Sequence, residues 1–120
     1  SLIKRAVSLK PNNGYYVDSL GWAFFKMGLL DEALAEIKKA VTLVRDDPVI
    51  YEHLGEIYLK QNRSQEAREA WLRSLELDPS NLKLIERFRD RGLGDPTLEE
   101  RVQQAQRRVS QPLPSQHAIP

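Results

Sequence analysis

The residues of this chain that are able to do chemistry show no spacing typical of a catalytic or metal site. His53 and His117 lie far apart and cysteine is absent, so the usual ligands of a zinc site are missing. Carboxylates occur near Trp22, as in some hydrolases, but nothing places an acid and a nucleophile at a working separation. There is also no nucleophile elbow, phosphate loop or HExxH motif. The sequence therefore predicts no catalysis, no cofactor and no metal.

The charge pattern argues against a nucleic acid or a membrane as the partner. Lys and Arg total 18 and Asp and Glu total 17, a formal net charge of +1, which produces no global positive field. The arginines between residues 87 and 108 are interrupted by Asp90, Asp95, Glu99 and Glu100, and no stacking aromatics accompany them. No apolar run approaches the roughly 20 residues that a membrane span needs. We therefore expect neither nucleic-acid binding nor direct membrane insertion.

Size and composition indicate one small globular domain. The chain has 120 residues, of which 41% are apolar and 29% are charged, values ordinary for a soluble domain with a modest core. It begins at Ser1 without a methionine or a signal-peptide pattern. We interpret it as a piece of a longer protein, whose targeting segment, if it has one, lies outside these residues.

A period of 34 residues organises the chain. The Leu-Gly pair that ends at Gly21 recurs at Gly55, and the Glu-Ala pair that ends at Ala33 recurs at Ala67. A fixed period of this length is typical of stacked helical arrays, in which each unit buries its apolar face only against its neighbours. Such arrays usually bind other proteins and rarely catalyse reactions, so the period favours a binding function.

Local signals divide the repeats into helices. The spacing of apolar residues predicts helices over 14–28, 31–44, 48–61 and 64–77. Asn13, Asp47 and Asn81 are separated by 34 residues each and stand where helices should begin. We expect their side chains to accept hydrogen bonds from free backbone N–H groups. Gly28 is the predicted stop of the first of these helices, and Ser64 is a predicted cap. The stop is repeated at Asn62.

Small residues mark the predicted crossing of the two helices in each repeat. Gly21 and Ala33 leave room for close approach, which a larger side chain would overpack. We therefore expect Gly21 to lie on Ala33, and Gly55 on Ala67, with large apolar side chains on either side.

These residues resemble the tetratricopeptide repeat, a helix–turn–helix unit of 34 residues. In this pattern a large residue is followed by Leu-Gly, an aromatic, a small residue, an aromatic or aliphatic, a second small residue and a proline. The first full unit supplies Val17, Leu20, Gly21, Phe24, Ala33, Ile37 and Ala40, with Arg45 in place of proline. The second supplies Tyr51, Leu54, Gly55, Tyr58, Ala67, Trp71, Ser74 and Pro79, and the start of the chain supplies Ile3, Ala6 and Pro11.

The resemblance implies an all-α fold, a right-handed superhelical stack of antiparallel helix hairpins. Its predicted parts are the second helix of a truncated repeat (1–13), two full repeats (14–47 and 48–81) and a degenerate helical cap (82–109). Residues 110–120 are proline-rich and polar, which predicts a disordered tail. We expect the array to have been longer on its N-terminal side.

The last third departs from the repeat pattern. Arg89, Arg101 and Arg108 stand in the places of Gly21, Ala33 and Ala40, and arginine is too large for a close helix crossing. Helix 81–91 is the predicted cap. Its expected inward residues are Leu82, Ile85 and Phe88, and its expected solvent-facing residues are Lys83, Glu86, Arg87 and Asp90. Helix 97–109 carries a narrow apolar stripe. Three arrangements stay open for this helix: it packs behind the cap, it swings away from the array, or it docks into the groove of another copy.

The resemblance also implies that the first helix of each repeat lines a concave surface. The inward positions hold Tyr15, Asp18, Trp22, Phe25, Val49, Glu52, Glu56 and Leu59, with Lys26 and Lys60 at the rim. Aromatics at one end and carboxylates in the middle favour a protein or peptide of basic or apolar character. Two alternatives stay open: Trp22 packs beneath a preceding unit, and the carboxylates are plain solvated charges.

One family subgroup clamps the C-terminal carboxylate of chaperones with lysines and asparagines on this surface. Asp18, Trp22 and Glu52 stand in those places, so we expect no such clamp. The five residues from Asp18 to Trp22 resemble repeats of bacterial envelope-associated proteins. This favours a bacterial envelope or periplasmic location, with the cytoplasm as the alternative.

The first functional hypothesis is a non-catalytic module that binds a peptide or helix of a partner on the concave face. The alternative is a structural or oligomerisation segment of a larger scaffold, with self-association through helix 97–109 or the N-terminal face. A third is an accessory segment of an enzyme whose catalytic domain lies outside this sequence.

Overall fold

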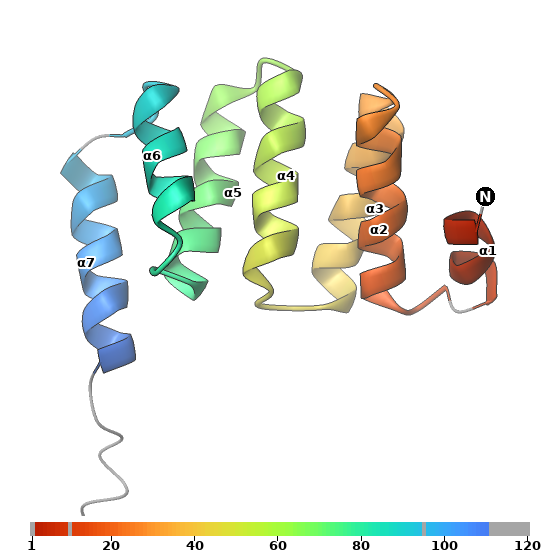
Figure 1. Cartoon of the computed structure of the whole chain (residues 1–120), viewed down its shortest axis with the longest axis horizontal. Helices are drawn as coiled ribbons and strands as arrows, with labels where there is room; N and C mark the ends of the chain where they lie inside the picture. Colours follow the sequence, from red (N-terminus) through yellow and green to blue (C-terminus); the bar gives the residue numbers. More distant parts are fainter. Residues whose placement is uncertain (1, 10, 95, 111–120) are drawn as a thin grey trace, which may run out of the picture.

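A computed structural model shows the chain as a row of helices that lie across its long axis (Figure 1). It describes residues 2–9, 11–94 and 96–110, and these form helices without any strand. The helices are α1 (Leu2–Leu9), α2 (Gly14–Lys26), α3 (Leu30–Leu43), α4 (Pro48–Lys60), α5 (Ser64–Leu77), α6 (Leu82–Asp90) and α7 (Pro96–Ser110). The body measures 55 × 40 × 18 Å. The predicted all-α stack of hairpins is confirmed, while the predicted tail lies, except for Ser110, outside the described residues.

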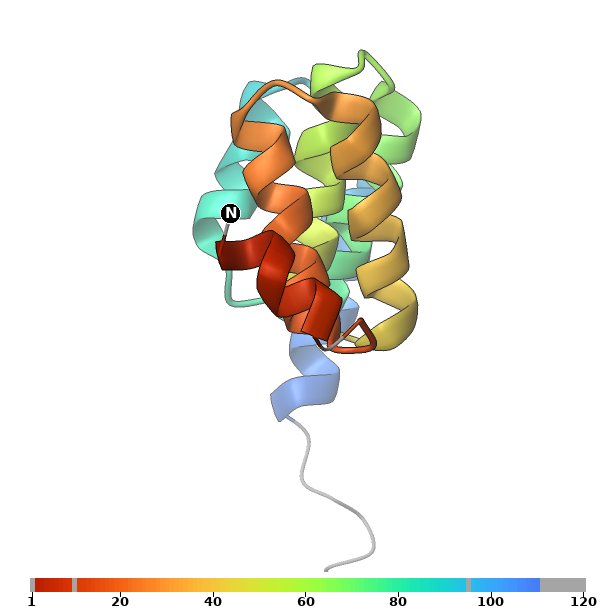
Figure 2. The same cartoon turned by 90° about the vertical axis from the view of Figure 1, so that its right-hand side faces the viewer.

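Consecutive helices from α1 to α6 pack against each other, and α7 packs on α5. Figure 2 shows α2 and α3 side by side, with α1 crossing the exposed side of α2. The pairs α2–α3 and α4–α5 form the tightest hairpins, and α3 packs on α4 to join them. Within the described ranges, no helix combines the length and the apolar composition of a transmembrane span.

Short polar side chains begin three of the helices, as predicted. The Asn13 Oδ1 accepts from the backbone N–H groups of Tyr15 and Tyr16, at 3.0 and 3.3 Å. The Asp47 carboxylate accepts from the N–H groups of the first turn of α4, at 2.8 and 3.3 Å, and Asn81 caps α6 at 3.1 Å. These bonds satisfy donors that a helix leaves free at its N-terminus.

The predicted cap at Ser64 is wrong. Ser64 is already the first helical residue of α5, and the residue before it, Arg63, makes no capping bond with its side chain. The Arg63 guanidinium instead donates to both carboxylate oxygens of Glu66, at 2.7 and 2.6 Å. This exposed pair joins the residue before α5 to the first turn of the helix.

Left-handed residues end the first helix of each hairpin, as predicted. Gly28 has φ of 79° and Asn62 has φ of 60°, a conformation that glycine and asparagine tolerate best. The next residue then donates its N–H back to the helix, Leu29 to Phe24 O and Arg63 to Tyr58 O, both at 2.9 Å. The same turn therefore occurs twice at the 34-residue spacing.

The glycines of the two hairpins lie against large side chains of the second helix. A Cβ added at Gly21 would lie 2.7 Å from Ile37 Cδ1, and one added at Gly55 would lie 2.2 Å from Trp71 Cδ1. Ile37 and Trp71 stand one helical turn after Ala33 and Ala67, the predicted contact residues, and both alanines are fully buried. The missing side chain of each glycine makes room for the bulky residue opposite.

The core consists of clusters between successive units. One joins α2 and α3 to α4 and contains Val17, Ala33, Ile37, Ala40, Ile50 and Ile57. Another joins α5 to α6 and α7 and contains Trp71, Leu72, Leu75, Leu84, Ile85, Phe88, Leu98 and Val102. Each unit thus buries its apolar face against the next one, as expected for a repeat array.

The cap helix α6 is rotated relative to the prediction. Ile85 and Phe88 are buried as expected, but Leu82 is 66% exposed and Leu84 is buried in its place. Leu82 stands in the first turn of α6, and the buried face is formed by positions i, i+1 and i+4 from Leu84, a normal helical spacing.

The C-terminal helix α7 packs against α5 of its own chain. Leu98, Val102 and Ala105 are buried, while Val109, at the end of the stripe, is 70% exposed. Arg101 pairs with Glu76 of α5, so an arginine in an alanine position reaches out to a partner instead of entering a close crossing. Of the three arrangements foreseen for this helix, packing within the chain is the one observed.

Candidate functional site

The eight residues predicted to bind a partner lie on the first helices of the two repeats, α2 and α4. Tyr15 and Val49 are 59% and 52% exposed near the starts of these helices. Trp22, Phe25 and Leu59 are partly buried. We call the surface formed by the eight residues the inner face. Its members are Tyr15, Asp18, Trp22, Phe25, Val49, Glu52, Glu56 and Leu59.

Trp22 lies in a stack of rings at the junction of the two repeats. Its ring centroid is 4.6 Å from that of Phe25 and 4.1 Å from that of His53, with interplanar angles of 16° and 19°. The Lys26 Nζ lies 5.2 Å from the centre of the Trp22 ring, within range of a cation–π interaction. This aromatic stack connects α2 to α4 and keeps part of its surface exposed.

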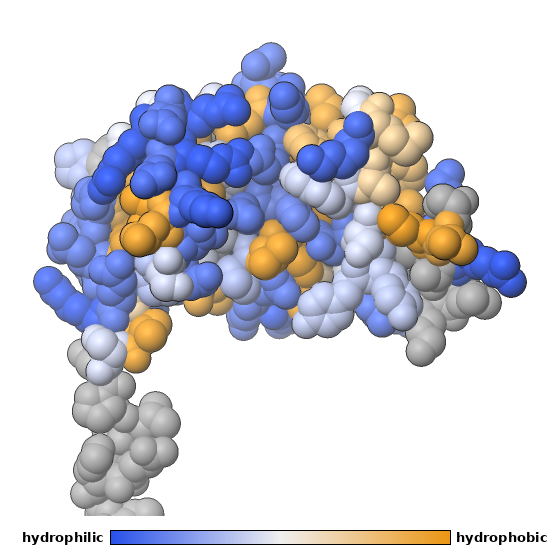
Figure 3. All heavy atoms as spheres, in the orientation of Figure 1, coloured by the Kyte–Doolittle hydropathy of each residue, from blue (hydrophilic) through white to orange (hydrophobic). Residues whose placement is uncertain are grey.

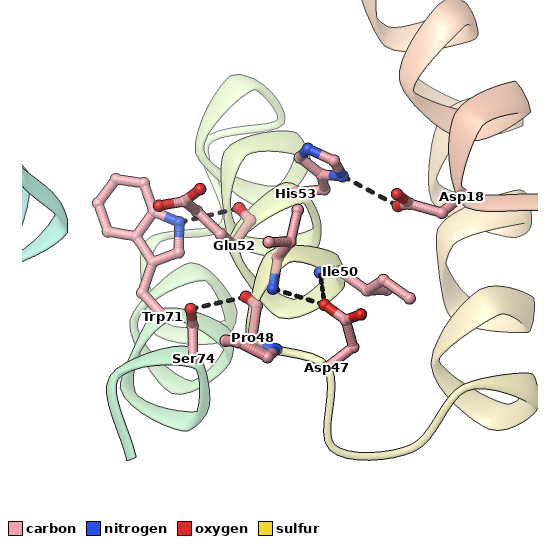
Figure 4. Close-up of polar contacts among 9 residues, drawn as sticks. Asp18, Asp47, Pro48, Ile50, Glu52, His53, Trp71 and Ser74 are labelled. Atoms are coloured by element: carbon pink, nitrogen blue, oxygen red, sulfur yellow. Dashed lines mark hydrogen bonds and ion pairs between the residues drawn. The ribbon is translucent and has the colours of Figure 1, made fainter. Parts of the chain in front are cut away.

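His53 also bonds to Asp18, and this contact was not foreseen from the sequence. Its Nδ1 lies 2.9 Å from the Asp18 carboxylate, and both side chains are largely buried (Figure 4). Because an ionised carboxylate only accepts, the imidazole N–H is the donor. The sequence indicated no role for His53, since its partner is 35 residues away.

The other two carboxylates of the inner face are bonded as well. The Asn81 side-chain amide donates to the Glu52 carboxylate at 3.0 Å. Arg87 of α6 pairs with Glu56, and its guanidinium lies 4.8 Å from the centre of the Trp71 ring. The prediction that Arg87 faces water is therefore wrong, because its partners come from two other helices.

The surroundings of Arg87 act on the pKa of its guanidinium in opposing directions, and the pKa is lowered overall. Burial lowers the pKa of the guanidinium from its usual value, while the charge of Glu52 raises it and that of Arg91 lowers it. Arginine stays protonated at neutral pH under such conditions. Arg87 therefore remains a fixed positive charge between the carboxylates of α4.

The same junction occurs twice with different chemistry. His53 and Arg87 are 34 residues apart, as are Asp18 and Glu52. In the first junction His53 contacts Asp18 and Trp22, and in the second Arg87 is near Glu52 and pairs with Glu56. A partner molecule therefore meets carboxylates whose oxygens already accept bonds from within the chain.

Two further bonds fix α4 to α5 behind this face (Figure 4). The Trp71 indole N–H donates to Glu52 O at 3.0 Å, and the Ser74 hydroxyl donates to Pro48 O at 2.7 Å. Glu52 therefore belongs to a rigid part of the hairpin, with its backbone held by Trp71 and its side chain by Asn81.

A pocket of about 460 Å³ lies at the C-terminal ends of α2 and α4. It is lined by Phe25, Lys26, Gly28, Leu30 and Lys60. We call it the lysine pocket, since Lys26 and Lys60 are both exposed there. The two lysines that the sequence placed at the rim of the face are thus brought together.

The rest of the surface differs between the ends of the array. In Figure 3 hydrophobic side chains gather over α1 and the upper part of α2, whereas hydrophilic ones dominate over α6. In the part of the chain that the structure describes, no group of three or more His, Asp or Glu side chains is arranged to hold a metal ion.

Comparisons with known proteins match the repeats. A family model described as "Tetratricopeptide repeat" matches residues 48–81, and one described as "TPR repeat" matches residues 21–62. The chain is 34% identical over 77 residues to the "Small glutamine-rich tetratricopeptide repeat-containing protein 2" of Mycosarcoma maydis. This alignment covers 64% of the chain and 22% of that protein, so the chain spans about a fifth of the length of this curated relative. The expected bacterial envelope location stays a prediction.

Proposed function

Because the chain belongs to the tetratricopeptide-repeat family, a protein-interaction fold that is generally non-catalytic, we propose that its inner face binds a segment of a partner protein. The observation that carries this proposal is the aromatic stack of Trp22, Phe25 and His53, which stays partly exposed at the junction of the two repeats. We expect the segment to cross α2 and α4 and to use this stack as its anchor.

The aromatic stack has the properties of a binding hot spot. Rigid aromatic side chains supply a large contact area at a small entropic cost, and Trp and Tyr dominate the energetics of many interfaces. Trp22 already contacts Phe25, His53 and Lys26, so its side chain loses little conformational entropy when a partner binds. Preorganisation of this kind strengthens binding.

The bonds of the carboxylates favour an apolar contact at the centre of the face. Asp18, Glu52 and Glu56 each have a partner within the chain. Breaking such bonds to bind a basic side chain would cost most of what the new ion pair gains. The apolar character predicted for the partner is therefore the one that the contacts support at the aromatic stack.

The test uses random peptides displayed on phage and selected against the immobilised chain. Selected peptides are synthesised, and their affinities for the wild type and for Trp22→Ala are measured by fluorescence anisotropy. We expect Trp22→Ala to weaken binding by about tenfold or more, the loss typical of a hot-spot residue.

The matched control is Tyr16→Ala, which removes a partly exposed aromatic from the same helix but outside the inner face. It should leave the affinity within about twofold, as expected for a residue outside the contact. Equal losses for the two variants, or no loss for Trp22→Ala, would contradict binding at this face. Circular dichroism verifies that both variants keep their helices.

Self-association is a second candidate, and the N-terminal end of the array favours it. Leu2, Met27 and Leu29 are exposed there, whereas the apolar stripe of α7 is occupied by α5. An exposed apolar patch often marks an interaction site. Light scattering over a range of concentrations should then show a dimer that Met27→Glu converts to a monomer. A wild type that is monomeric at every concentration would eliminate this candidate.

A further inference from the structure

We propose that the lysine pocket is a subsite for an acidic side chain, Asp or Glu, which stands next to an apolar residue in the partner segment. This inference rests on the proposed function, because the pocket adjoins the aromatic stack through Phe25 and Lys26. The carboxylates of the inner face led to the sequence-based prediction of a basic or apolar partner. The lysine pocket instead favours an acidic side chain at this point of the partner segment.

The first argument is the charge of the pocket lining. Lys26 and Lys60, which both line the pocket, are positively charged. In the described ranges no carboxylate forms an ion pair with Lys26 or Lys60. The lining of the lysine pocket is therefore positive, and charge complementarity selects an acidic group.

The second argument is the composition of the pocket wall. Phe25 and Leu30 supply its apolar part, and the two lysines supply its polar part. A volume of about 460 Å³ lies in the usual range for small binding pockets. The nearby Asp31 is not part of the lining, and its carboxylate accepts from the Gln61 side chain at 3.2 Å. An apolar residue against Phe25, with a carboxylate beside it, satisfies both parts of the wall.

The open turn at Gly28 lets a side chain within a longer segment supply the carboxylate. A Cβ added at Gly28 would have no atom within 4 Å, so the rim of the pocket is open at this turn. A segment is therefore able to pass over the rim and continue, with an internal Asp or Glu directed toward the lysines.

The subsite also fixes where the segment lies along the array. The residue 34 positions after Lys60 is Gly94, so the second junction lacks the matching lysine. The pair of lysines therefore occurs at the junction of the two full repeats. A segment with its acidic residue in the lysine pocket would place neighbouring residues on the aromatic stack.

The experiment extends the phage selection to the double variant Lys26→Glu/Lys60→Glu. Peptides on phage are fused through their C-termini, so only internal carboxylates are sampled. The wild type should enrich Asp or Glu next to an apolar residue, and the double variant should lose this enrichment and favour Lys or Arg. Lys38→Glu, a charge reversal on the exposed side of α3 outside the pocket, should select the same peptides as the wild type.

Synthetic peptides with amidated C-termini give the quantitative test. Changing the enriched Glu to Gln should weaken binding to the wild type by about threefold to tenfold, the range for one or two exposed ion pairs. The same change should have no effect on the double variant. A Glu-to-Lys peptide should regain affinity for the double variant, and both effects should shrink at high salt.

The outcomes separate this inference from the proposed function. Selected peptides that depend on Trp22 but carry no acidic preference would overturn the subsite and leave the proposed function standing. An acidic preference that survives in the double variant, or a requirement for a free C-terminal carboxylate, would also overturn the subsite. If no selected peptide depends on Trp22, the proposed function fails and the subsite fails with it.

Discussion

Gly21 and Gly55 occupy equivalent positions in the two repeats but meet different neighbours. A Cβ at Gly21 would press on Cδ1 and Cγ1 of Ile37, an aliphatic side chain with more rotamers than a ring that is held by a hydrogen bond. A Cβ at Gly55 would press on the Trp71 ring. That ring is fixed by its bond to Glu52 O and by Phe88, whose centroid is 5.5 Å away.

We therefore predict that Gly55→Ala costs more stability than Gly21→Ala. Overpacking against the fixed ring should lower the free energy of unfolding by about 2–3 kcal/mol. For Gly21→Ala the strain is largely offset by the better helix propensity of alanine, so the loss should stay below about 1 kcal/mol. Urea denaturation followed by circular dichroism measures both, and equal losses would contradict the difference in neighbours.

Ser74 provides a second prediction for a single residue. Its hydroxyl is buried and donates to Pro48 O at 2.7 Å, a bond between α5 and the start of α4. Ser74→Ala should lower the free energy of unfolding by about 1 kcal/mol, the usual contribution of such a bond. Ser64→Ala, at an exposed serine of the same helix, is the control and should change stability by less than about half of that. A neutral Ser74→Ala would show that the bond contributes nothing.

Single residues also show how far the sequence predicts the site. The 34-residue period predicts that Trp22 lies on the first helix of a repeat, and α2 contains it. Its stacking on His53 could not be predicted, because the period gives no side-chain direction at position 53. Arg87 was expected in water for the same reason: the contacts with Glu56 and Trp71 depend on how three helices meet. Local sequence patterns identify the position of a residue on its helix, whereas its contacts with other helices depend on how those helices are arranged in space.

The helix ends show the opposite case. Asn13, Asp47 and Asn81 cap their helices as predicted, because a capping bond joins residues two or three positions apart. The stops at Gly28 and Asn62 depend on a backbone conformation that the residue type itself favours. Ser64 failed because it lies one residue inside the helix, a shift that sequence patterns do not resolve.

The cap of α4 gives a prediction for a whole element. Asp47→Ala removes the acceptor for two backbone N–H groups at 2.8 and 3.3 Å. We expect the free energy of unfolding to fall by about 1 kcal/mol, as measured by thermal or urea denaturation. Asp47→Asn keeps an acceptor in place and should retain most of the stability. Equal losses in both variants would show that the charge, rather than the capping bond, is what stabilises α4.

At the scale of the whole molecule, stability depends on contacts between neighbours. The cluster around Ile37 and the cluster around Trp71 lie in different parts of the array. A change in one of them should therefore act locally, as expected for a repeat array whose units contact only the next unit. The fold class follows from the period in the sequence, but the packing of α7 on α5 does not, since its arginines break the repeat pattern.

We predict that Leu98→Ala loosens only the C-terminal part of the molecule. Leu98 is buried against α5 and α6, so its truncation should cost about 2–4 kcal/mol in that part. Amide hydrogen exchange should increase in α5, α6 and α7 and stay unchanged in α2 and α3. Val109→Ala, at an exposed position of the same helix, should change neither region. Faster exchange in α2 and α3 would show that the array unfolds as one unit.

The orientation of the helices across the long axis has a mechanical consequence. When the two ends of the array are pulled apart, the load falls on one seam between adjacent hairpins at a time, since each hairpin is attached mainly to its neighbours. Extension should proceed in discrete steps at modest force, each step releasing one hairpin. Under tension the chain would thus act as a compliant tether that lengthens before it loses all of its folded units.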